Sequence, residues 1–317
     1  MEQEQERGAG AGHLLLFPFL AQGHIIPFLN LAKRIEGLEE PRRPRITIVS
    51  TPRNVAGLRR AVPAGSSIGF AELPFCPSDH GLPADAESTD VIPFMDYPAL
   101  FFATESLRAP FEKLVSELAA REGCKNVCVL ADFFMGWTAE SARELGVQHR
   151  LFVTSGAYAS AVTFCLWLRQ PTFPRPVNPD DEQAVPDFPD VRLRHEQLLN
   201  VVITEDESNP MTQFLRRTLN LHFRHSGGVI VNTAEEIEAK GLEMIGKLSG
   251  VVGGLDKGWE HVSDVVETVL GDGEKARDMR AKAAELKKLA RAAVSVDGKV
   301  KGSSVLAMER LLDGAFR

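Results

Sequence analysis

The chain has 317 residues, of which 44% are hydrophobic and 25% are charged, a balance typical of a globular protein with a substantial core. This composition excludes fibrous and intrinsically disordered proteins. Its 43 acidic residues outnumber 36 basic ones, and the resulting net charge of -7 provides no basic surface for nucleic acid or for an anionic membrane. We therefore expect no nucleic-acid partner.

The cysteines and the first residues indicate a reducing compartment. Four cysteines are too few for a disulfide framework, and Cys124 and Cys128 are separated by three residues rather than by the two of common zinc and redox motifs. We expect no metal site. The opening MEQEQERGAGAG is acidic, whereas a signal peptide is basic there, and no apolar run is long enough to cross a bilayer. The sequence thus predicts a cytoplasmic protein with no integral membrane segment, whose residues 1–12 are disordered.

Short β-rich apolar segments alternate with amphipathic helical segments over residues 13–250. This alternation predicts an α/β fold with a doubly wound parallel sheet. The predicted strands are His13–Phe19, Arg45–Thr51, Ser67–Leu73, Val127–Asp132, His149–Thr154 and Gly228–Asn232. The predicted helices are Ile25–Gly37, Pro52–Ala61, Phe94–Arg121, Gly136–Leu145, Ala157–Leu168, Pro210–Arg224 and Ala234–Leu248.

Two segments differ from this alternation. Gln170–Pro189 holds six prolines and is predicted to be a long surface loop, neither helix nor central strand. Beyond Ser249 a glycine-rich joint leads into helical sequence without a strand, with helices expected at Trp259–Leu270, Lys275–Ala293 and Val305–Leu312. We expect the last helix to dock on the α/β domain through Val305, Leu306, Met308, Leu311 and Leu312.

The loop after the first strand is the first place to look for chemistry, because ligands of doubly wound sheets bind at the carboxyl ends of the strands. The loop reads LAQGHIIPF: Gly23 permits close backbone approach, and His24 can exchange a proton near neutral pH. Asp132 ends the fourth strand, so the fold can bring it to His24 as the carboxylate that orients a general base. The alternatives are that His24 satisfies a helix terminus and that Asp132 caps the following helix.

At these residues the sequence resembles the plant family-1 UDP-glycosyltransferases of the GT-B fold. Six segments match in family order: FPFLAQGHIIPFLNLAKRI, ITIVSTPRN, ELPFCPSDHGLP, VLADFFMGWTAESARELGV, FVTSGAYASA and GGVIVNTAEEIE. The tail segments MRAKAAELKKLARAAV and GSSVLAMERLL are similar to the family's end. The resemblance covers residues 13–250 and 258–317. It implies a Rossmann-like acceptor-binding domain over 13–250 and a helical remnant of the C-terminal domain over 251–317.

The resemblance also implies inverting transfer of a sugar from a UDP-sugar, a co-substrate, to a hydroxyl of a small lipophilic acceptor such as a flavonoid, phenolic or terpenoid. No other cofactor is implied. His24 would be the base and Asp132 its balancing carboxylate, with Gly23 and Thr154 near the donor. The resemblance offers four residues for an acceptor pocket, with core packing as the alternative for each: Phe94, Phe133, Phe134 and Tyr158.

One family segment is missing from this sequence, and its absence changes the activity that we expect. The family's His-Cys-Gly-Trp-Asn-Ser segment, which holds UDP at a helix N-terminus, has no counterpart in this sequence. We therefore expect UDP-sugar binding and hexosyltransferase activity to be impaired or lost. The alternatives are a non-catalytic acceptor-binding or regulatory fragment, or the product of a faulty gene model. A nicotinamide dehydrogenase is disfavoured, because no G-x-G-x-x-G follows the first strand.

Overall fold

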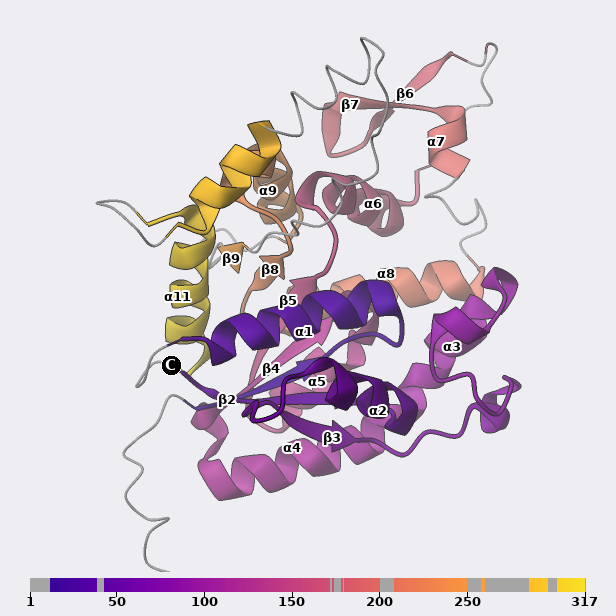
Figure 1. Cartoon of the computed structure of the whole chain (residues 1–317). Helices are drawn as coiled ribbons and strands as arrows, with labels where there is room; N and C mark the ends of the chain where they lie inside the picture. Colours follow the sequence, from indigo (N-terminus) through magenta and orange to yellow (C-terminus); the bar gives the residue numbers. More distant parts are fainter. Residues whose placement is uncertain are drawn as a thin grey trace, which may run out of the picture.

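The computed structural model describes residues 12–38, 43–171, 173, 178, 180–199, 208–249, 258–259, 285–295 and 301–316. A parallel sheet forms the centre of the molecule, with the strand order β3-β2-β1-β4-β5-β8-β9 (Figure 1). Its strands are β1 (His13–Phe17), β2 (Arg45–Ser50), β3 (Gly69–Glu72), β4 (Val127–Asp132), β5 (Gln148–Val153), β8 (Val229–Val231) and the two-residue β9 (Gly258–Trp259). The predicted doubly wound α/β fold is confirmed.

Helices connect the strands in the expected alternation. The longer helices are α1 (Gln22–Glu36), α2 (Pro52–Ala61), α3 (Tyr97–Ala103), α4 (Arg108–Glu122), α5 (Trp137–Glu144), α6 (Ala157–Arg169), α8 (Pro210–His225), α9 (Glu235–Ser249) and α11 (Ser303–Ala315). A further helix covers residues 285–293. None of the described helices is long and apolar enough to span a membrane.

The strand order reverses between β1 and β4, and this reversal positions the site. The chain moves outward from β1 to β2 and β3, then returns to β4 on the other side of β1. Leu16 pairs in register with Leu130, so the two strands end together, with His24 just beyond one and Asp132 at the end of the other. The crevice of such a switch point is where doubly wound sheets bind ligands.

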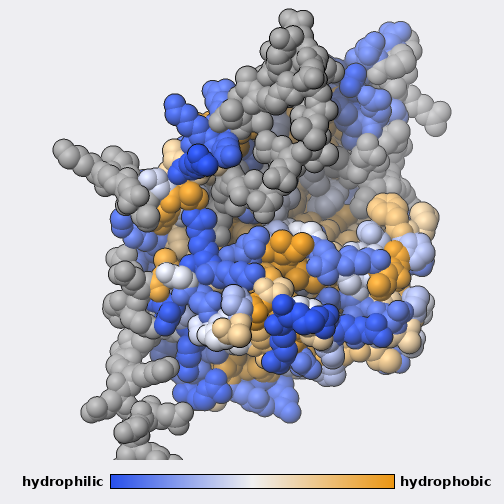
Figure 2. All heavy atoms as spheres, viewed as in Figure 1, coloured by the Kyte–Doolittle hydropathy of each residue, from blue (hydrophilic) through white to orange (hydrophobic). Residues whose placement is uncertain are grey.

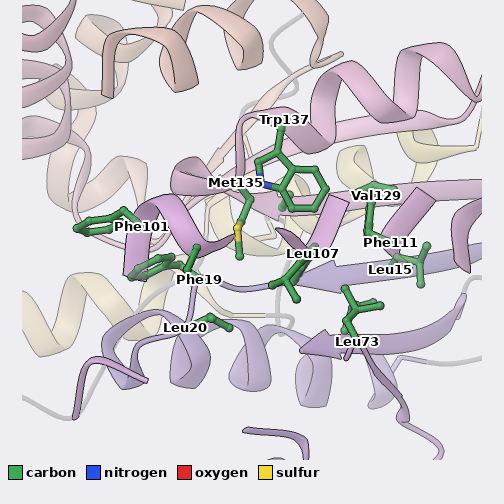
Figure 3. Packing of buried hydrophobic residues seen from close by; sticks show 14 of the residues in the cluster. Leu15, Phe19, Leu20, Leu73, Phe101, Leu107, Phe111, Val129, Met135 and Trp137 are labelled. Carbon is green, nitrogen blue, oxygen red and sulfur yellow. The ribbon is translucent and has the colours of Figure 1, made fainter. Parts of the chain in front are cut away.

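Alternating side chains along the strands build a core on each face of the sheet. Leu14, Leu16, Ile46 and Ile48 pack under α1, α2 and α11. Leu15, Phe17 and Val49 face the opposite way, toward α3, α4, α5 and α8. The second core extends to the site edge, where the rings of Phe19 and Phe101 stack with centroids 4.7 Å apart (Figure 3). Burial on both faces explains why these strands read as continuous apolar runs.

The single helix predicted over Phe94–Arg121 is wrong. A 3-10 turn (Phe94–Asp96), α3, a second 3-10 turn (Thr104–Leu107) and α4 replace it. Pro98 lies at the start of α3 and Pro110 in the first turn of α4. Since proline lacks the backbone N–H that an interior turn needs, the helix restarts at each proline.

The surface loop predicted over Gln170–Pro189 is corrected in its second half. Residues 182–194 form an antiparallel hairpin of β6 (Glu182–Val185) and β7 (Phe188–Arg194), outside the main sheet and followed by α7 (His195–Leu199). Val185 and Phe188 are buried in the same cluster as α6. The prolines fall before the hairpin, in its turn at Pro186 and near the start of β7 at Pro189, so they masked a short apolar pattern.

The C-terminal region also differs from expectation in part. Trp259 was predicted to begin a helix but lies in β9, which pairs with β8. The prediction that no strand follows Ser249 is therefore wrong. The expected helices over 260–270 and 275–284, and disorder over 1–11, fall outside the described residues. The expected division at residue 250 stays a prediction.

The last helix docks on the α/β domain as expected, through a slightly different face. Met308, Leu311 and Leu312 are buried with β1, β2 and α1, whereas Leu306 is 36% exposed and Val305 only half-buried. Ser304, Ala307 and Ala315 complete the buried stripe in their place, at helical spacing.

Polar contacts fix both ends of α11. The Ser303 hydroxyl and backbone N–H donate to the Glu236 carboxylate. At the other end, Arg150 Nη2 donates to the Gly314 carbonyl at 2.6 Å. Each contact compensates the unpaired backbone groups of a helix end.

Leu311→Ala is expected to lower the free energy of unfolding by about 2 kcal/mol, since it leaves a cavity under α11. Leu306→Ala, on the exposed side of the same helix, is the matched control and should change it by less than about 0.5 kcal/mol. Urea denaturation measures both. Hydrogen exchange across residues 301–316 as fast as in an unstructured peptide would contradict the docking itself.

Candidate active site

His24 and Asp132 meet at the switch point of the sheet. His24 lies in the first turn of α1, and its Nδ1 is 2.6 Å from Asp132 Oδ2, although 108 residues separate the two in sequence. The Asp132 side chain is fully buried, and the His24 side chain is 19% exposed. The predicted contact is present, and it leaves the imidazole open to solvent on one side.

This geometry selects the imidazole tautomer. A carboxylate only accepts hydrogen bonds, so Nδ1 of His24 carries the proton and donates a hydrogen bond to Asp132. The lone pair on Nε2 is therefore available. Asp132 Oδ1 accepts a bond from the Phe134 backbone N–H at 3.1 Å, so both carboxylate oxygens are engaged. Within the described residues no protein group is hydrogen-bonded to Nε2. The pair is arranged as a base and its orienting carboxylate, and the Phe134 contact shows that Asp132 also caps the following turn.

Thr154, which follows β5, contacts the same ring. Its Oγ1 is 3.2 Å from His24 Nδ1, so the hydroxyl predicted to lie near a donor is here beside the base. Gly23 is exposed, and a Cβ built on it would meet no atom within 4 Å. Space above this loop is open to a ligand, and nothing within the described residues requires a glycine there.

Aromatic rings surround the base on its protein side. The ring centroids of Phe19, Phe133 and Phe134 lie 5.5, 6.1 and 5.4 Å from that of His24. Phe101 adds a ring 4.4 Å from Phe134. Two of the four residues expected to line an acceptor pocket, Phe133 and Phe134, are thus near the base; Phe133 is buried in a core cluster, which is the alternative expected for it, and Phe134 is half-buried. Phe19 and Phe101 were not predicted, although Phe19 is only five residues before His24.

Phe94 and Tyr158 lie away from this cluster. Phe94 is 78% exposed and packs on Tyr97, and Tyr158 is 41% exposed. Neither ring has a contact with His24 among the described residues, and their exposure excludes the alternative of core packing. Met95, 81% exposed, and Phe102 extend the apolar surface over α3 that Figure 2 shows.

Carboxylates occupy two more helix N-termini at this edge. Glu238 accepts from the backbone N–H groups of Ala157 at 2.9 Å and of Tyr158 at 3.1 Å, at the start of α6. A non-helical residue conformation (φ -134°, ψ 41°) at Glu238 bends α9 there. Glu87 likewise accepts from the Arg53 N–H at the start of α2. In contrast, the first turn of α1 has no acidic residue, and its N-cap, Ala21, provides no side-chain cap.

Glu238→Ala is expected to lower the free energy of unfolding by about 1 kcal/mol, because it removes the acceptor at the positive end of the α6 dipole. Glu238→Gln, which keeps one accepting oxygen, should lose less. Chemical denaturation measures both variants. Equal stability of the alanine variant and the wild type would show that the cap is dispensable.

His222, on α8, contacts the main chain at Asp132 and was not predicted as a site residue. Its Nε2 is 3.2 Å from the Asp132 carbonyl oxygen and 3.1 Å from that of Phe133. Burial lowers the pKa of His222 to about 4, more than the nearby Asp132 charge raises it. A sequence signal exists: Met211, Leu215 and His222 recur at helical spacing, which places the histidine on the buried face.

The described residues contain no cluster of three or more His, Cys, Asp or Glu side chains placed to hold a metal ion. Burial raises the pKa of Cys128 to about 12 and that of Cys165 to about 11, so neither thiol is a ready nucleophile. The chemistry at this edge therefore centres on His24.

Comparisons with known proteins identify similar plant glycosyltransferases. Crocetin glucosyltransferase 3 from Crocus sativus is 39% identical over 241 residues, which are 75% of this chain and 49% of that protein. UDP-glycosyltransferase 92A1 from Arabidopsis thaliana is 33% identical over 242 residues, with the same coverage. No family model matches the chain.

Solved structures give the fold. The crystal structure of Glycyrrhiza uralensis UGT73P12 complexed with glycyrrhetinic acid 3-O-monoglucuronide superposes with a TM-score of 0.59 at 19% identity, covering 88% of this chain and 54% of that one. The fold is therefore the N-terminal half of a GT-B fold. The aligned part of the chain belongs to the plant UDP-glycosyltransferase family. The chain spans about half the length of the curated relatives it matches.

Proposed function

We propose that this chain provides the acceptor-binding and proton-accepting half of a UDP-glycosyltransferase that acts on a small lipophilic acceptor. The observation that carries the proposal is the His24–Asp132 contact of 2.6 Å at the switch point, with the His24 side chain partly exposed and aromatic rings beside it. The names of the curated relatives support the same class of reaction.

The proposed reaction uses His24 as general base. Nε2 takes the proton of the acceptor hydroxyl while the oxygen attacks the anomeric carbon of the donor sugar, and UDP leaves from the opposite face with the electron pair of the broken bond. The configuration at that carbon is inverted. Asp132 stabilises the imidazolium that forms, and Thr154 and Gly23 lie where the donor sugar and phosphates would approach.

The aromatic rings beside His24 point to the class of acceptor. Phe134 is half-buried beside His24, and the buried rings of Phe19 and Phe133 back it, so the surroundings of the base are apolar and favour a lipophilic molecule with a hydroxyl directed to Nε2. Flavonoids, phenolics and terpenoids fit this description. UDP-sugar is the only co-substrate in this proposal, and we propose that the chain by itself binds acceptor better than donor.

Acceptor binding tests the proposal directly. A flavonol such as quercetin should bind the purified chain, and Phe134→Ala should weaken binding about tenfold because it removes a ring at the base. Phe94→Ala, the matched control on the exposed surface over α3, should leave binding nearly unchanged. Isothermal titration measures both. Equal binding by the wild type and Phe134→Ala would show that the ring of Phe134 does not contact the acceptor.

The alternative proposal is a non-catalytic acceptor-binding or regulatory fragment. Acceptor binding is common to both proposals. Turnover distinguishes the catalytic proposal from the non-catalytic one.

A further inference from the structure

We propose that His222 is a positioning residue for the base: from α8 it holds the main chain at Asp132 and Phe133, so that the carboxylate stays directed at Nδ1 of His24. The proposal rests on the proposed function in that His24 is the base. Its observable consequence is the His24–Asp132 hydrogen bond itself, which can be measured without turnover.

The contacts that carry the proposal lie directly behind Asp132. β4 ends at this residue, and the chain turns at once into the 3-10 turn Phe133–Met135. His222 Nε2 reaches the carbonyl oxygens of Asp132 and Phe133 at 3.2 and 3.1 Å. Carbonyl oxygens only accept, so Nε2 carries the proton and donates to both. The fully buried imidazole thus pairs two carbonyl groups at the point where the strand ends.

A second set of contacts connects His222 to His149 through Ser226. Its Nδ1 is 3.4 Å from Ser226 Oγ, and that hydroxyl is 2.8 Å from His149 Nδ1. On its other side, His149 Nε2 is 3.0 Å from Thr138 Oγ1, which donates its own hydrogen to the Met135 carbonyl. Thr138 therefore accepts from His149 Nε2–H, and His149 Nδ1 accepts the hydrogen of Ser226. The Ser226 hydrogen is thus committed to His149, and the two carbonyl oxygens at Nε2 set the tautomer of His222.

Burial keeps His222 neutral, although the Asp132 charge and the two carbonyl groups at its Nε2 favour the protonated ring. Asp132 approaches from β4 and His149 from β5, with Arg150 and His225 acting electrostatically on His149. Burial lowers the pKa of His222 to about 4 and that of His149 well below its ordinary value. At neutral pH the neutral Nε2–H form of His222 is consequently the donor behind Asp132, and this form needs no change when the base takes up a proton.

An NMR experiment on the whole chain tests the proposal. The probe is the downfield proton on Nδ1 of His24, shared with Asp132, and its exchange rate with water. His222→Leu should speed that exchange roughly tenfold, because the loss of a buried hydrogen bond loosens the Asp132 segment. His222→Gln places an amide N–H near the position of Nε2 and should restore slow exchange. Ser226→Ala leaves the Nε2 contacts intact and should have a smaller effect.

The outcomes are distinct. Unchanged exchange in a folded His222→Leu, or no rescue by His222→Gln, overturns the proposal, because a merely structural role would not move the His24 proton. Should His222→Leu not fold, the ring ¹⁵N shifts of the wild type decide: the Nε2–H tautomer together with slow exchange in His222→Gln supports the proposal, and an Nδ1–H tautomer or fast exchange in that variant refutes it. If the His24 proton responds as expected but no acceptor binds, the proposed function fails and the positioning role stands.

Discussion

UDP-glucose turnover by this chain alone is expected to be at least about 100-fold below that of a full-length relative, and His24→Ala is expected to lower it little further. A base can act only on an acceptor held against an activated sugar. Helix N-termini can bind phosphate, but at this edge those of α2 and α6 already hold Glu87 and Glu238. The departing UDP therefore has few partners among the described residues.

The assay pairs a flavonol with UDP-glucose and follows the glucoside by chromatography, with a full-length relative as the positive control. Asp132→Asn, which keeps the shape but not the charge, should likewise have little effect on the residual rate. Ordinary turnover that His24→Ala abolishes would show that the chain holds a donor site of its own or obtains one from a second chain. Gel filtration of the active species would then separate these two cases.

The stability of the protein is expected to fall by about 3 kcal/mol as the pH is lowered from 6.5 to about 4, because His222 is buried in its neutral form. Burial lowers its pKa from 6.5 in the unfolded chain to about 4 in the folded one. In this window the unfolded state binds more protons than the folded state. The contribution is complete above pH 6.5 and is lost as the pH falls through the window. His149 and His13, whose pKa values burial also lowers, act in the same direction.

Urea denaturation as a function of pH measures this loss. His222→Gln should reduce the pH dependence by roughly the contribution of one buried histidine, since glutamine does not titrate. His225→Gln, three residues along the same helix and only half-buried, is the matched control and should keep the wild-type dependence. Equal stability of the wild type at pH 7 and pH 4.5 would contradict the expectation.

The strands of the sheet could be predicted to within a few residues because burial on both faces makes each one a continuous apolar run. Asp132 could be assigned to a strand end for the same reason, and its meeting with His24 followed from the topology. The breaks within residues 94–121 were missed because helical periodicity outweighed Pro98 and Pro110. The hairpin of β6 and β7 was missed because its prolines dominated the composition of that segment.

Other parts of the site depend on packing that no local pattern records. His222 reaches Asp132 only through the docking of α8 on the turn after β4, and Phe101 reaches Phe134 only through the placement of α3. The buried stripe on α11 differs from the predicted one because it includes two small residues, Ala307 and Ser304. Small buried residues give little hydrophobic signal in sequence even when they decide which face of a helix docks.

The attachment of α11 at both ends has a consequence for loop-closure entropy. Glu236 on α9 and Arg150 on β5 hold a helix that begins at Ser303, whereas α9 ends at Ser249, so the two ends of the interval between these helices, which includes β9 and the helix over 285–293, are held in place. The entropic cost of closing a flexible loop rises only logarithmically with its length, by about 0.6 kcal/mol for each doubling. A fourfold longer interval would thus cost roughly 1.2 kcal/mol, less than the burial of Leu311 alone provides. By this reasoning an insertion in the interval costs little free energy, and α11 can stay docked on the sheet.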